Sequence, residues 1–376
     1  MRILNILIVL LVIPVPILHS QNEYNEIENE SRFNYVYEQG SAGYEVYRIP
    51  AIVKTSNNVL LAFAEARKFR RNGDAGDIDL VVKRSVNNGQ TWSEQVTVWD
   101  DGENSCGNPV PIVDDKGRVH LLMTWNKGED KWGMLVNGKG IDTRRAYYTY
   151  SDDEGISWSE PKEITSDIKK TSWDWYGTGP VHGIQVKNGR YRGRLVAPNY
   201  FTIREEEKVV DYSHMVYSDD YGKNWKAGDP TPSGKVGECS VTELRDGTLL
   251  LNMRASEGNY RMQSLSHDGG ITWSDPKVNL HQLDAGCQGS ILAMDEKVLL
   301  SNAAANTRTN LTLTISRDDG VTWDEEITVH AGKSGYSDLV KISENLVGIF
   351  YEGGIKRYTD GLDFKIIDIH SKSIME

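Results

Sequence analysis

The segment "SDDEGISW", Ser151–Trp158, decides the fold, because its pattern recurs four more times along the chain. Every copy begins with Ser, has Asp or Asn at the third position, Gly at the fifth and Trp at the eighth. Repetition of this kind indicates one structural unit that is used several times. The other copies are "SVNNGQTW" (Ser85–Trp92), "SDDYGKNW" (Ser218–Trp225), "SHDGGITW" (Ser266–Trp273) and "SRDDGVTW" (Ser316–Trp323).

The residue types of the repeat are those of a hairpin turn. Asp or Asn accepts backbone N–H groups within the turn, and Gly adopts a positive φ. The Trp side chain is expected to pack back on the neighbouring sheet. The first copy has Asn87 at the third position, which keeps the acceptor oxygen. The acidic residues of the repeats are therefore predicted to be structural, and none of them is expected to be catalytic.

The spacing of the copies predicts the architecture. Their first residues are 66, 67, 48 and 50 positions apart, which fits one four-stranded blade with variable loops. At about 60 residues a blade, six blades result, one of them without the turn motif. We predict an all-β fold, a six-bladed β-propeller that forms a single domain over residues 21–376. Residues Phe33–Tyr37 are expected to pair with Gly361–Ile369 in the last blade.

The first 20 residues have the pattern of a secretory signal. Arg2 precedes an apolar stretch from Ile3 to Ile17, and the small residue Ser20 follows. A retained membrane anchor is the alternative, but prolines interrupt the stretch and it falls short of the roughly 20 residues needed to span a bilayer. Cleavage near Ser20 is predicted, with no membrane insertion afterwards and a secreted or periplasmic location.

Composition restricts the partners and cofactors. The chain has 54 acidic and 42 basic residues, a net charge of −12, which argues against nucleic acid or an anionic membrane as a partner. An anionic ligand would therefore need a local group of arginines. Cys106, Cys239 and Cys287 are odd in number and widely spaced, so they are predicted to be buried free thiols. No metal-ligand cluster or phosphate loop is found, and no cofactor is predicted.

The segment "EVYRIPAIV", Glu45–Val53, carries Arg48 in an otherwise strand-like run. In isolation Arg48 would be a solvated edge arginine. Together with the repeats, the Arg-Ile-Pro motif resembles the signature of the non-viral sialidase (neuraminidase) superfamily, whose repeats are called Asp boxes. The resemblance extends from Phe33 to the C-terminus.

The resemblance implies an exo-α-sialidase that acts as a monomer on sialylated glycans and removes terminal sialic acid with retention of configuration. Two alternatives keep the fold. A trans-sialidase or intramolecular trans-sialidase would use the same catalytic residues, and a sugar-binding propeller would have no turnover.

Three arginines are implied to bind the sialic acid carboxylate. They are Arg48, Arg254 in "ELRDGTLLLNMR" and Arg308 in "NAAANTRTNLTLTISRDDG". Taken singly, each would be read as part of a surface salt bridge. A charge-assisted hydrogen bond to a carboxylate contributes roughly 1.5–3 kcal/mol. Glu352, in "YEGG", resembles the family glutamate that orients Arg48.

The resemblance places the chemistry on Tyr336, Glu238 and Asp74. Tyr336, in "GYSDLV", is the expected nucleophile, and Glu238, in "GECSVTEL", is the expected base, because a phenol with a pKa of about 10 needs a proton acceptor. A neutral nucleophile avoids repulsion by the substrate's own carboxylate, and sialidases are a known exception to carboxylate nucleophiles. Asp74 is the expected acid and base, with Asp77 as a rival.

Further residues are implied to contact the sugar. Arg67, in "FAEAR", and Asn108, in "CGNP", are expected to reach its hydroxyl and ring substituents. Apolar contacts to the N-acyl group or the rim are expected from aromatic residues, with core packing as the alternative: Trp125, Trp132, Trp175 and Tyr176. The basic run Lys68, Arg70 and Arg71 is predicted to be a solvated loop face. His182 is predicted to be a surface or hydrogen-bonded histidine.

Overall fold

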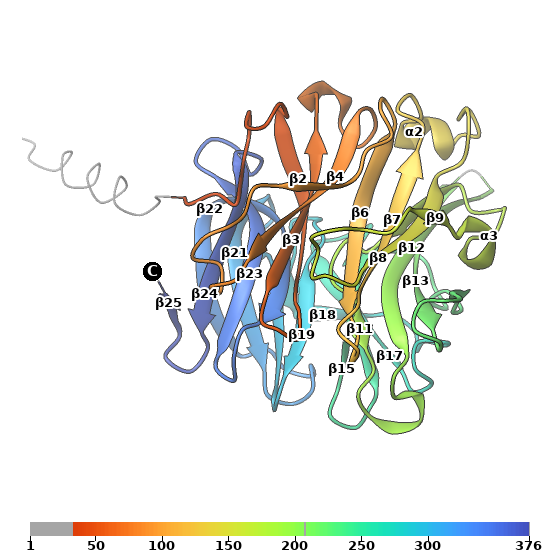
Figure 1. Ribbon diagram of the computed structural model, residues 1–376. Coiled ribbons are helices and arrows are strands. Elements are labelled where there is room, and N and C mark those ends of the chain that lie inside the picture. The colour runs from red at the N-terminus through yellow and green to blue at the C-terminus, as the bar shows by residue number, and fades with distance from the viewer. Residues whose placement is uncertain (1–32, 207, 376) are drawn as a thin grey trace, which may run out of the picture. The chain divides into compact units, whose positions relative to one another are not determined.

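Antiparallel sheets make up the protein in the computed structural model, which describes residues 33–206 and 208–375 (Figure 1). The predicted signal, residues 1–20, lies outside the described residues. The chain from Asn34 to Glu376 forms one compact unit. Within the described ranges, no helix combines the length and apolarity that a membrane crossing requires.

One eight-stranded sheet consists of two four-stranded groups, which a single parallel bridge between Ile78 and Ser105 connects. The first group contains β2 (Val46–Lys54), β3 (Leu60–Arg67), β4 (Ile78–Ser85) and β5 (Val96–Trp99). The second contains β6 (Ser105–Val113), β7 (Val119–Asn126), β8 (Arg145–Ser151) and β9 (Lys162–Glu163).

Two smaller sheets follow along the chain. The third group contains β10 (Trp175–Thr178), β11 (Ile184–Gln185), β12 (Leu195–Glu205), β13 (Lys208–Ser218) and β14 (Lys226–Ala227). The fourth contains β15 (Val236–Glu243), β16 (Leu249–Ala255), β17 (Tyr260–Ser266) and β18 (Lys277–Leu283). The short helices η1 (Arg70–Asn72), α2 (Trp132–Leu135), α3 (Thr165–Ile168) and η2 (Gly189–Tyr191) lie in connections between strands.

The long strand β22 (Glu325–Lys341) belongs to both groups of the last sheet, because its first half pairs with β21 and its second half with β23. The fifth group contains β19 (Ser290–Met294), β20 (Lys297–Ala303), β21 (Thr309–Ser316) and the start of β22. The sixth contains the end of β22, β23 (Leu346–Gly354), β24 (Gly361–Asp368), β25 (Ser373–Met375) and β1 (Tyr37–Glu38). Tyr37 pairs with Leu362, which confirms the predicted pairing of the two ends of the described chain.

The five repeats are hairpin turns of the predicted kind. In the second copy, Ser151 Oγ donates to Asp153 Oδ1 at 2.8 Å, and Gly155 N donates to Ser151 Oγ at 2.8 Å. Asp153 Oδ1 also accepts from Ser157 N. Gly155 has φ +79°, which explains the Gly at the fifth position. These carboxylates are occupied by the turn, so the structure confirms that the repeats hold acidic residues for structural reasons.

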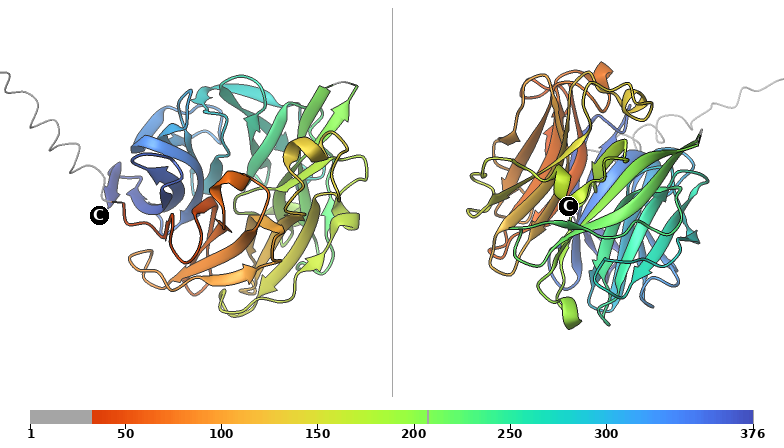
Figure 2. Two further views of the ribbon diagram at one scale, coloured as in Figure 1. Left: turned by 90° about the horizontal axis from the view of Figure 1, so that it is seen from above. Right: turned by 90° about the vertical axis from the view of Figure 1, so that its right-hand side faces the viewer.

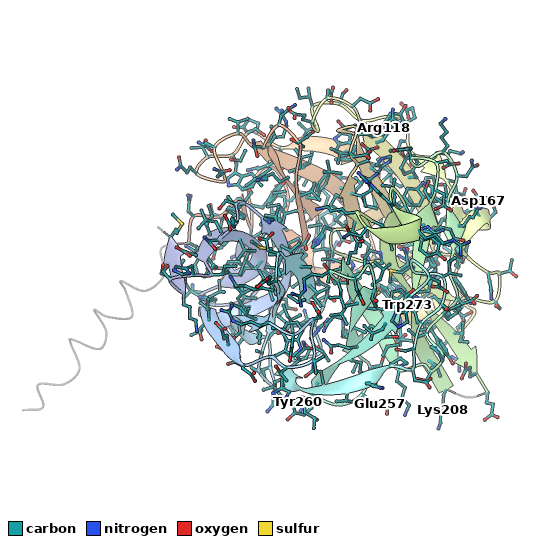
Figure 3. The ribbon with its side chains drawn as sticks, turned by 90° about the horizontal axis from the view of Figure 1, so that it is seen from below. Arg118, Asp167, Lys208, Glu257, Tyr260 and Trp273 are labelled. Carbon is teal, nitrogen blue, oxygen red and sulfur yellow. The ribbon has the colours of Figure 1, made fainter. Side chains whose placement is uncertain are left out.

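The repeat tryptophans join each group to the group before it. Trp158 follows β8 but lies edge-on against Phe63 of β3, with 5.6 Å between ring centroids. Trp273 packs with Met215 of β13, and in Figure 3 it lies inward of Lys208 and Tyr260, which are at the periphery. The core is therefore built between successive strand groups.

The first and last groups also pack together. Trp92, in the first repeat, lies against Phe364 of β24 with 5.6 Å between ring centroids. Strands β2 and β22 contact each other, and Figure 2 shows the orange strands at the start of the unit beside the blue strands at its end. The sixth group has no repeat after β24.

A buried carboxylate connects the inner strands. Asp338 on β22 is fully buried, and its Oδ2 accepts Ile52 N from β2 at 2.8 Å and His182 N at 3.0 Å. Its Oδ1 accepts the hydroxyl of Ser290 on β19 at 2.7 Å and lies 2.7 Å from His182 Nδ1. His182 is thus a buried, hydrogen-bonded histidine, which agrees with one of its two predicted environments.

Candidate active site

A β-bulge on β2 directs Arg48 into the site. The register of β2 against β3 shifts between Arg48 and Ala51, and Ile49 has φ +60°. A β-branched residue in the left-handed region is strained by about 1–3 kcal/mol. Glu352 on β23 holds this geometry, because its Oε1 accepts both Arg48 Nε at 2.9 Å and Ile49 N at 3.1 Å.

The expected pairing of Arg48 with Glu352 is present. Glu352 Oε2 also accepts Arg48 Nη2 at 3.2 Å, which makes the contact bidentate, and it accepts Tyr336 N at 3.2 Å. Glu352 is fully buried and Arg48 is 9% exposed. One buried carboxylate therefore orients the first arginine and the backbone of the proposed nucleophile together.

Two further bulges bring Tyr336 and Glu238 together. The register of β22 shifts between Ser334 and Ser337, and the register of β15 shifts between Val236 and Cys239. The phenol of Tyr336 donates to Glu238 Oε1 at 2.6 Å. Burial and the Glu238 carboxylate raise the pKa of Tyr336 well above its ordinary value, against the opposing effect of nearby arginines. The phenol is therefore neutral in the free protein.

The three arginines surround the Tyr336 ring. Arg254 Nη1 lies 3.2 Å from Tyr336 Oη and 2.8 Å from Glu238 Oε2. The guanidinium carbons of Arg48 and Arg308 lie 5.0 and 5.3 Å from the ring centroid. Glu238 raises the pKa of Arg254 above its ordinary value. Three guanidiniums thus converge where an anion would stabilise them.

Asp74 lies in the loop after η1, within reach of Arg48. Its Oδ1 is 2.9 Å from Arg67 Nη2 and 3.6 Å from Arg48 Nη1, and its side chain is 64% exposed. Partial burial acts to raise the pKa of Asp74, but the charges of Arg67 and Arg48 outweigh it and lower the pKa to about 2. Asp74 is ionised in the free protein.

The rival Asp77 does not reach the site. It lines neither of the cavities that adjoin Asp74, and burial raises its pKa. Asp79 is fully buried and accepts a hydrogen bond from Tyr44. The geometry therefore favours Asp74 among the acidic residues of this loop.

Sequence analysis missed Glu65. Like Glu352, Glu65 accepts hydrogen bonds from one arginine side chain and from one backbone N–H group. Glu65 is buried on β3, and its Oε2 accepts Arg67 Nη2 at 2.6 Å. Its Oε1 accepts the backbone N–H of Asn108 at 2.9 Å, at a bulge in β6 where Asn108 has φ +52°. The signal that could have found it is the spacing "EAR", which places Glu65 and Arg67 on the same face of a strand.

Asn108 lies beneath the site surface. Its amide nitrogen donates to Thr178 O at 3.2 Å, and its Oδ1 accepts from Arg144 Nη2 at 3.3 Å. Arg144 is buried and lies over the Trp175 ring at 3.8 Å. Burial lowers the pKa of Arg144. This buried guanidinium was also missed by sequence analysis, since no motif distinguished it from the surface Arg145.

Two of the four aromatic residues follow the alternative prediction of packing away from the sugar. Trp125 lines neither of the two cavities that adjoin Asp74. Its indole N–H instead donates to Asp101 at 2.7 Å. Tyr176 is fully buried and packs against Trp173 in the core, so it does not line the rim.

A cavity of about 370 Å³ contains the chemistry-bearing groups. Asp74, Glu238, Arg254 and Tyr336 line it, and so do the predicted aromatics Trp132 and Trp175. Trp132 is 49% exposed, which is typical of a rim position. A larger cavity of about 1020 Å³ holds His182 but none of the three arginines or Tyr336, so the smaller one is the candidate active site.

Two further predictions concern cysteines and metals. Cys106, Cys239 and Cys287 are free and buried, as predicted. Across residues 33–206 and 208–375, no group of three or more His, Cys, Asp or Glu side chains could hold a metal ion.

Comparison with known proteins now identifies the family. The model of the BNR repeat-like domain matches residues 58–349. The "Exo-alpha-sialidase" of Aspergillus fumigatus is 30% identical over 352 residues, which cover 85% of this chain and 81% of that protein. This chain belongs to the sialidase family.

Other sialidases are similar in sequence and structure. The "Sialidase" of Bacteroides fragilis is 29% identical over 83% of this chain, but the chain spans only 61% of that protein's length. A Hadza microbial sialidase of known structure is 27% identical, with a TM-score of 0.79 over 90% of this chain and 68% of that one. The intramolecular trans-sialidase of Ruminococcus gnavus, at 20% identity, has the same fold, with a TM-score of 0.73 over 92% of this chain and 99% of that one.

Proposed function

We propose that this protein is an exo-α-sialidase, a glycoside hydrolase that removes terminal α-linked sialic acid with retention of configuration. The observation that carries this proposal is the 2.6 Å hydrogen bond from Tyr336 to Glu238 within a set of three arginines. A phenol beside a base is a nucleophile arrangement, and the arginines provide for an anionic sugar. Membership of the sialidase family supports the same activity.

The architecture that we propose is a six-bladed β-propeller, with the six strand groups as blades. Its support is the packing of Trp92 on Phe364, which links the first group to the last, and the contact between β2 and β22. The bonds of Asp338 to three other segments also suit inner strands that meet at one axis. Full closure removes the unpaired edges of separate sheets.

Substrate binding would begin at the arginines. The carboxylate of sialic acid would accept hydrogen bonds from Arg48, Arg254 and Arg308 and would offset their mutual repulsion. Arg254 would then interact with the substrate carboxylate as well as with Glu238. Its weaker interaction with Glu238 would make Glu238 a stronger proton acceptor. Arg48 remains oriented by Glu352 throughout.

The first chemical step forms a bond between Tyr336 Oη and the anomeric carbon. Glu238 takes the phenol proton as this bond forms, and the bond to the leaving oxygen breaks as Asp74 gives that oxygen a proton. The product is a covalent sialyl-enzyme. A neutral phenol suits this carbon because the attached carboxylate would repel a charged nucleophile.

Asp74 must gain a proton before it can serve as the acid. Its pKa of about 2 in the free protein depends on Arg67 and Arg48. A bound substrate carboxylate would neutralise part of the Arg48 charge and raise the pKa of Asp74. The second step requires the ionised form of Asp74, which takes a proton from water as the water oxygen bonds to the anomeric carbon. The bond between Tyr336 and this carbon breaks, and Tyr336 regains its proton from Glu238.

Transfer to another acceptor is the alternative outcome. The leech intramolecular trans-sialidase has the same fold at 19% identity, which supports no choice between hydrolysis and transfer. Incubation with sialyllactose isomers tests both, with product analysis that separates free sialic acid, transfer products and anhydro-sugar. Free sialic acid is expected. Absence of any cleavage would leave a sugar-binding propeller as the better account.

We also propose that the protein is exported from the cell. The pattern of Arg2, the apolar stretch and Ser20 supports export, to the medium or a periplasm. Fractionation with N-terminal sequencing of the mature protein tests it. A first residue near Gln21 is expected, and an intact N-terminus in the exported protein would contradict cleavage.

A further inference from the structure

A second cavity adjoins Asp74 and has a strongly basic wall. It has a volume of about 510 Å³, and Asp74 lines both this cavity and the active-site cavity. Among the described residues that line the second cavity, Asp74 is the only acidic one. The basic residues in its wall are Arg48, Arg67, Arg70, Lys333, Lys356 and Arg357.

Two of these six basic groups are already compensated. Arg48 pairs with Glu352, and Arg67 pairs with Glu65 and Asp74. They belong to the active site described above. The excess of positive charge therefore comes from the other four residues.

Those four residues make no ion pair among the described residues. The Arg70 guanidinium donates to the hydroxyl of Thr359 at 2.7 Å and to the side-chain oxygen of Gln39. These acceptors are neutral, so they hold Arg70 in place without cancelling its charge. Lys333, Lys356 and Arg357 are exposed. Arg70 was predicted to be part of a solvated loop face, and the structure shows instead that it is fixed in this wall.

The loop between β23 and β24 is built to present the positive groups. Asp360 Oδ2 accepts the backbone N–H groups of Lys356 and Arg357 at 2.8 and 3.1 Å. Tyr358 follows Lys356 and Arg357 in this loop. Its ring centroid lies 4.8 Å from the guanidinium carbon of Arg308 and 5.6 Å from that of Arg48. The basic loop is thereby joined to the carboxylate-binding arginines through one aromatic side chain.

The position of the cavity relative to Asp74 indicates which part of a substrate reaches it. The oxygen that Asp74 protonates belongs to the leaving glycan, so this glycan must lie within hydrogen-bond reach of Asp74. The sialic acid occupies the side with Tyr336 and Glu238. A leaving glycan that extends past Asp74 then meets Lys333, Lys356 and Arg357.

We propose that this cavity is a subsite for an anionic group on the leaving glycan, either the carboxylate of a second sialic acid or a sulfate ester. The proposal rests on the proposed sialidase function. A chain with a net charge of −12 repels such glycans at long range, so a local basic wall is needed to bind them. Substrates with this second anion are favoured over neutral ones.

The test compares three substrates with wild-type protein and the variant Lys333→Ser/Lys356→Ser/Arg357→Ser. The substrates are 3′-sialyllactose, an α2,8-disialyllactose and a 3′-sialyl-N-acetyllactosamine with a 6-sulfate on its glucosamine. In the variant, kcat/KM for at least one dianionic substrate should fall by about tenfold or more, as expected for the loss of charge-assisted contacts. For 3′-sialyllactose it should stay within about twofold, since no catalytic group is touched.

The control is Lys223→Ser/Lys226→Ser, which removes two exposed lysines near the third repeat. It should leave unchanged the ratio of kcat/KM for each dianionic substrate to kcat/KM for 3′-sialyllactose. A fall for the disialyl substrate assigns the subsite to a carboxylate, and a fall for the sulfated substrate alone assigns it to sulfate. Unchanged ratios for both overturn the proposal. If wild-type protein does not cleave 3′-sialyllactose, the proposed function fails. In that case calorimetric binding of disialic acid and of 6-sulfo-N-acetyllactosamine to the two proteins still decides about the cavity, and equal affinities of the two proteins for both ligands overturn the proposal.

Discussion

The phenol oxygen of Tyr336 lies 2.6 Å from Glu238 Oε1, although the two residues are 98 positions apart in sequence. The strands that carry them belong to different sheets, and each has a bulge at this point. The contact therefore exists only because two local irregularities face each other across the site. It gives a buried phenol a proton acceptor, which the proposed chemistry requires.

Glu238→Gln should lower kcat for an aryl sialoside by about 10²–10⁴-fold, the usual contribution of a general base. The amide can still accept the phenol hydrogen bond but cannot take its proton. Steady-state kinetics with a melting curve checks this. Glu243→Gln, at the end of the same strand, is the matched control and should be close to wild type. A Glu238→Gln enzyme with normal turnover would remove Glu238 from the mechanism.

Asp74→Asn should affect substrates according to their leaving group. Sialyllactose has a poor leaving group and should lose about 10²–10⁴-fold in kcat/KM, whereas an aryl sialoside with an acidic phenol should lose much less in the sialylation step. Asp77→Asn should behave as wild type with both. Equal losses for the two substrates in Asp74→Asn would argue against Asp74 as the acid.

The low pKa of Asp74 predicts a pH dependence with a definite sign. Because Asp74 is ionised above about pH 2 in the free protein, the protonated form needed for a poor leaving group becomes rarer as the pH rises. The kcat/KM for sialyllactose should therefore fall from pH 5 to 8 more steeply than that for an activated aryl sialoside. The ratio of the two profiles measures this effect, and a constant ratio would contradict it.

Arg308→Ala should weaken the binding of free sialic acid by about 10–100-fold, the equivalent of one charge-assisted hydrogen bond of roughly 1.5–3 kcal/mol. Calorimetric titration measures the affinity. Arg245→Ala is a suitable control, since Arg245 forms an exposed surface pair with Asp319. Unchanged affinity in Arg308→Ala would exclude this arginine from carboxylate binding.

His214 should make the protein less stable in acid. Its ring is fully buried beside Trp173 and Phe201, and burial lowers its pKa to about 3. An unfolded histidine has a pKa of about 6.5. Between pH 6.5 and 3 the unfolded state therefore binds a proton that the folded state does not, so stability falls by up to about 1.4 kcal/mol per pH unit as the pH drops.

The variant His214→Phe has no group at this position that can bind the proton in the unfolded state. Its melting temperature should therefore decline less between pH 6.5 and 4 than that of wild type. His281→Gln, at an exposed position, should leave the decline as it is in wild type. If His214→Phe declines as steeply as wild type, other groups cause the acid sensitivity.

Most of the sheet arrangement could be predicted because the repeat carries it in residue types. Ser, Asp, Gly and Trp at fixed positions make one turn, and the structure has that turn after β4, β8, β13, β17 and β21. Family resemblance then named Arg48, Arg254, Arg308, Tyr336 and Glu238, which the structure brings together. Neither the repeat nor the family resemblance predicted the positive φ of Ile49, because β-branched residues rarely adopt that conformation.

The errors have a common physical origin in the direction of side chains. Trp125 was one of the aromatic residues expected at the site, but its indole N–H donates to Asp101 and it lines neither cavity at Asp74. Arg70 looked solvated in a run of basic residues, but contacts with Gln39 and Thr359, distant in sequence, fix it. Arg144 is visible only through its three-dimensional partners Asn108 and Thr124.

Trapping of the covalent intermediate tests the central claim most directly. The reagent for this experiment is 2,3-difluorosialic acid. After incubation of this protein with that reagent, intact mass and peptide mapping should show one fluorosialyl group on the peptide that contains Tyr336. The Tyr336→Phe variant should acquire none. Labelling of another residue, or turnover of sialyllactose by Tyr336→Phe at the wild-type rate, would contradict the account.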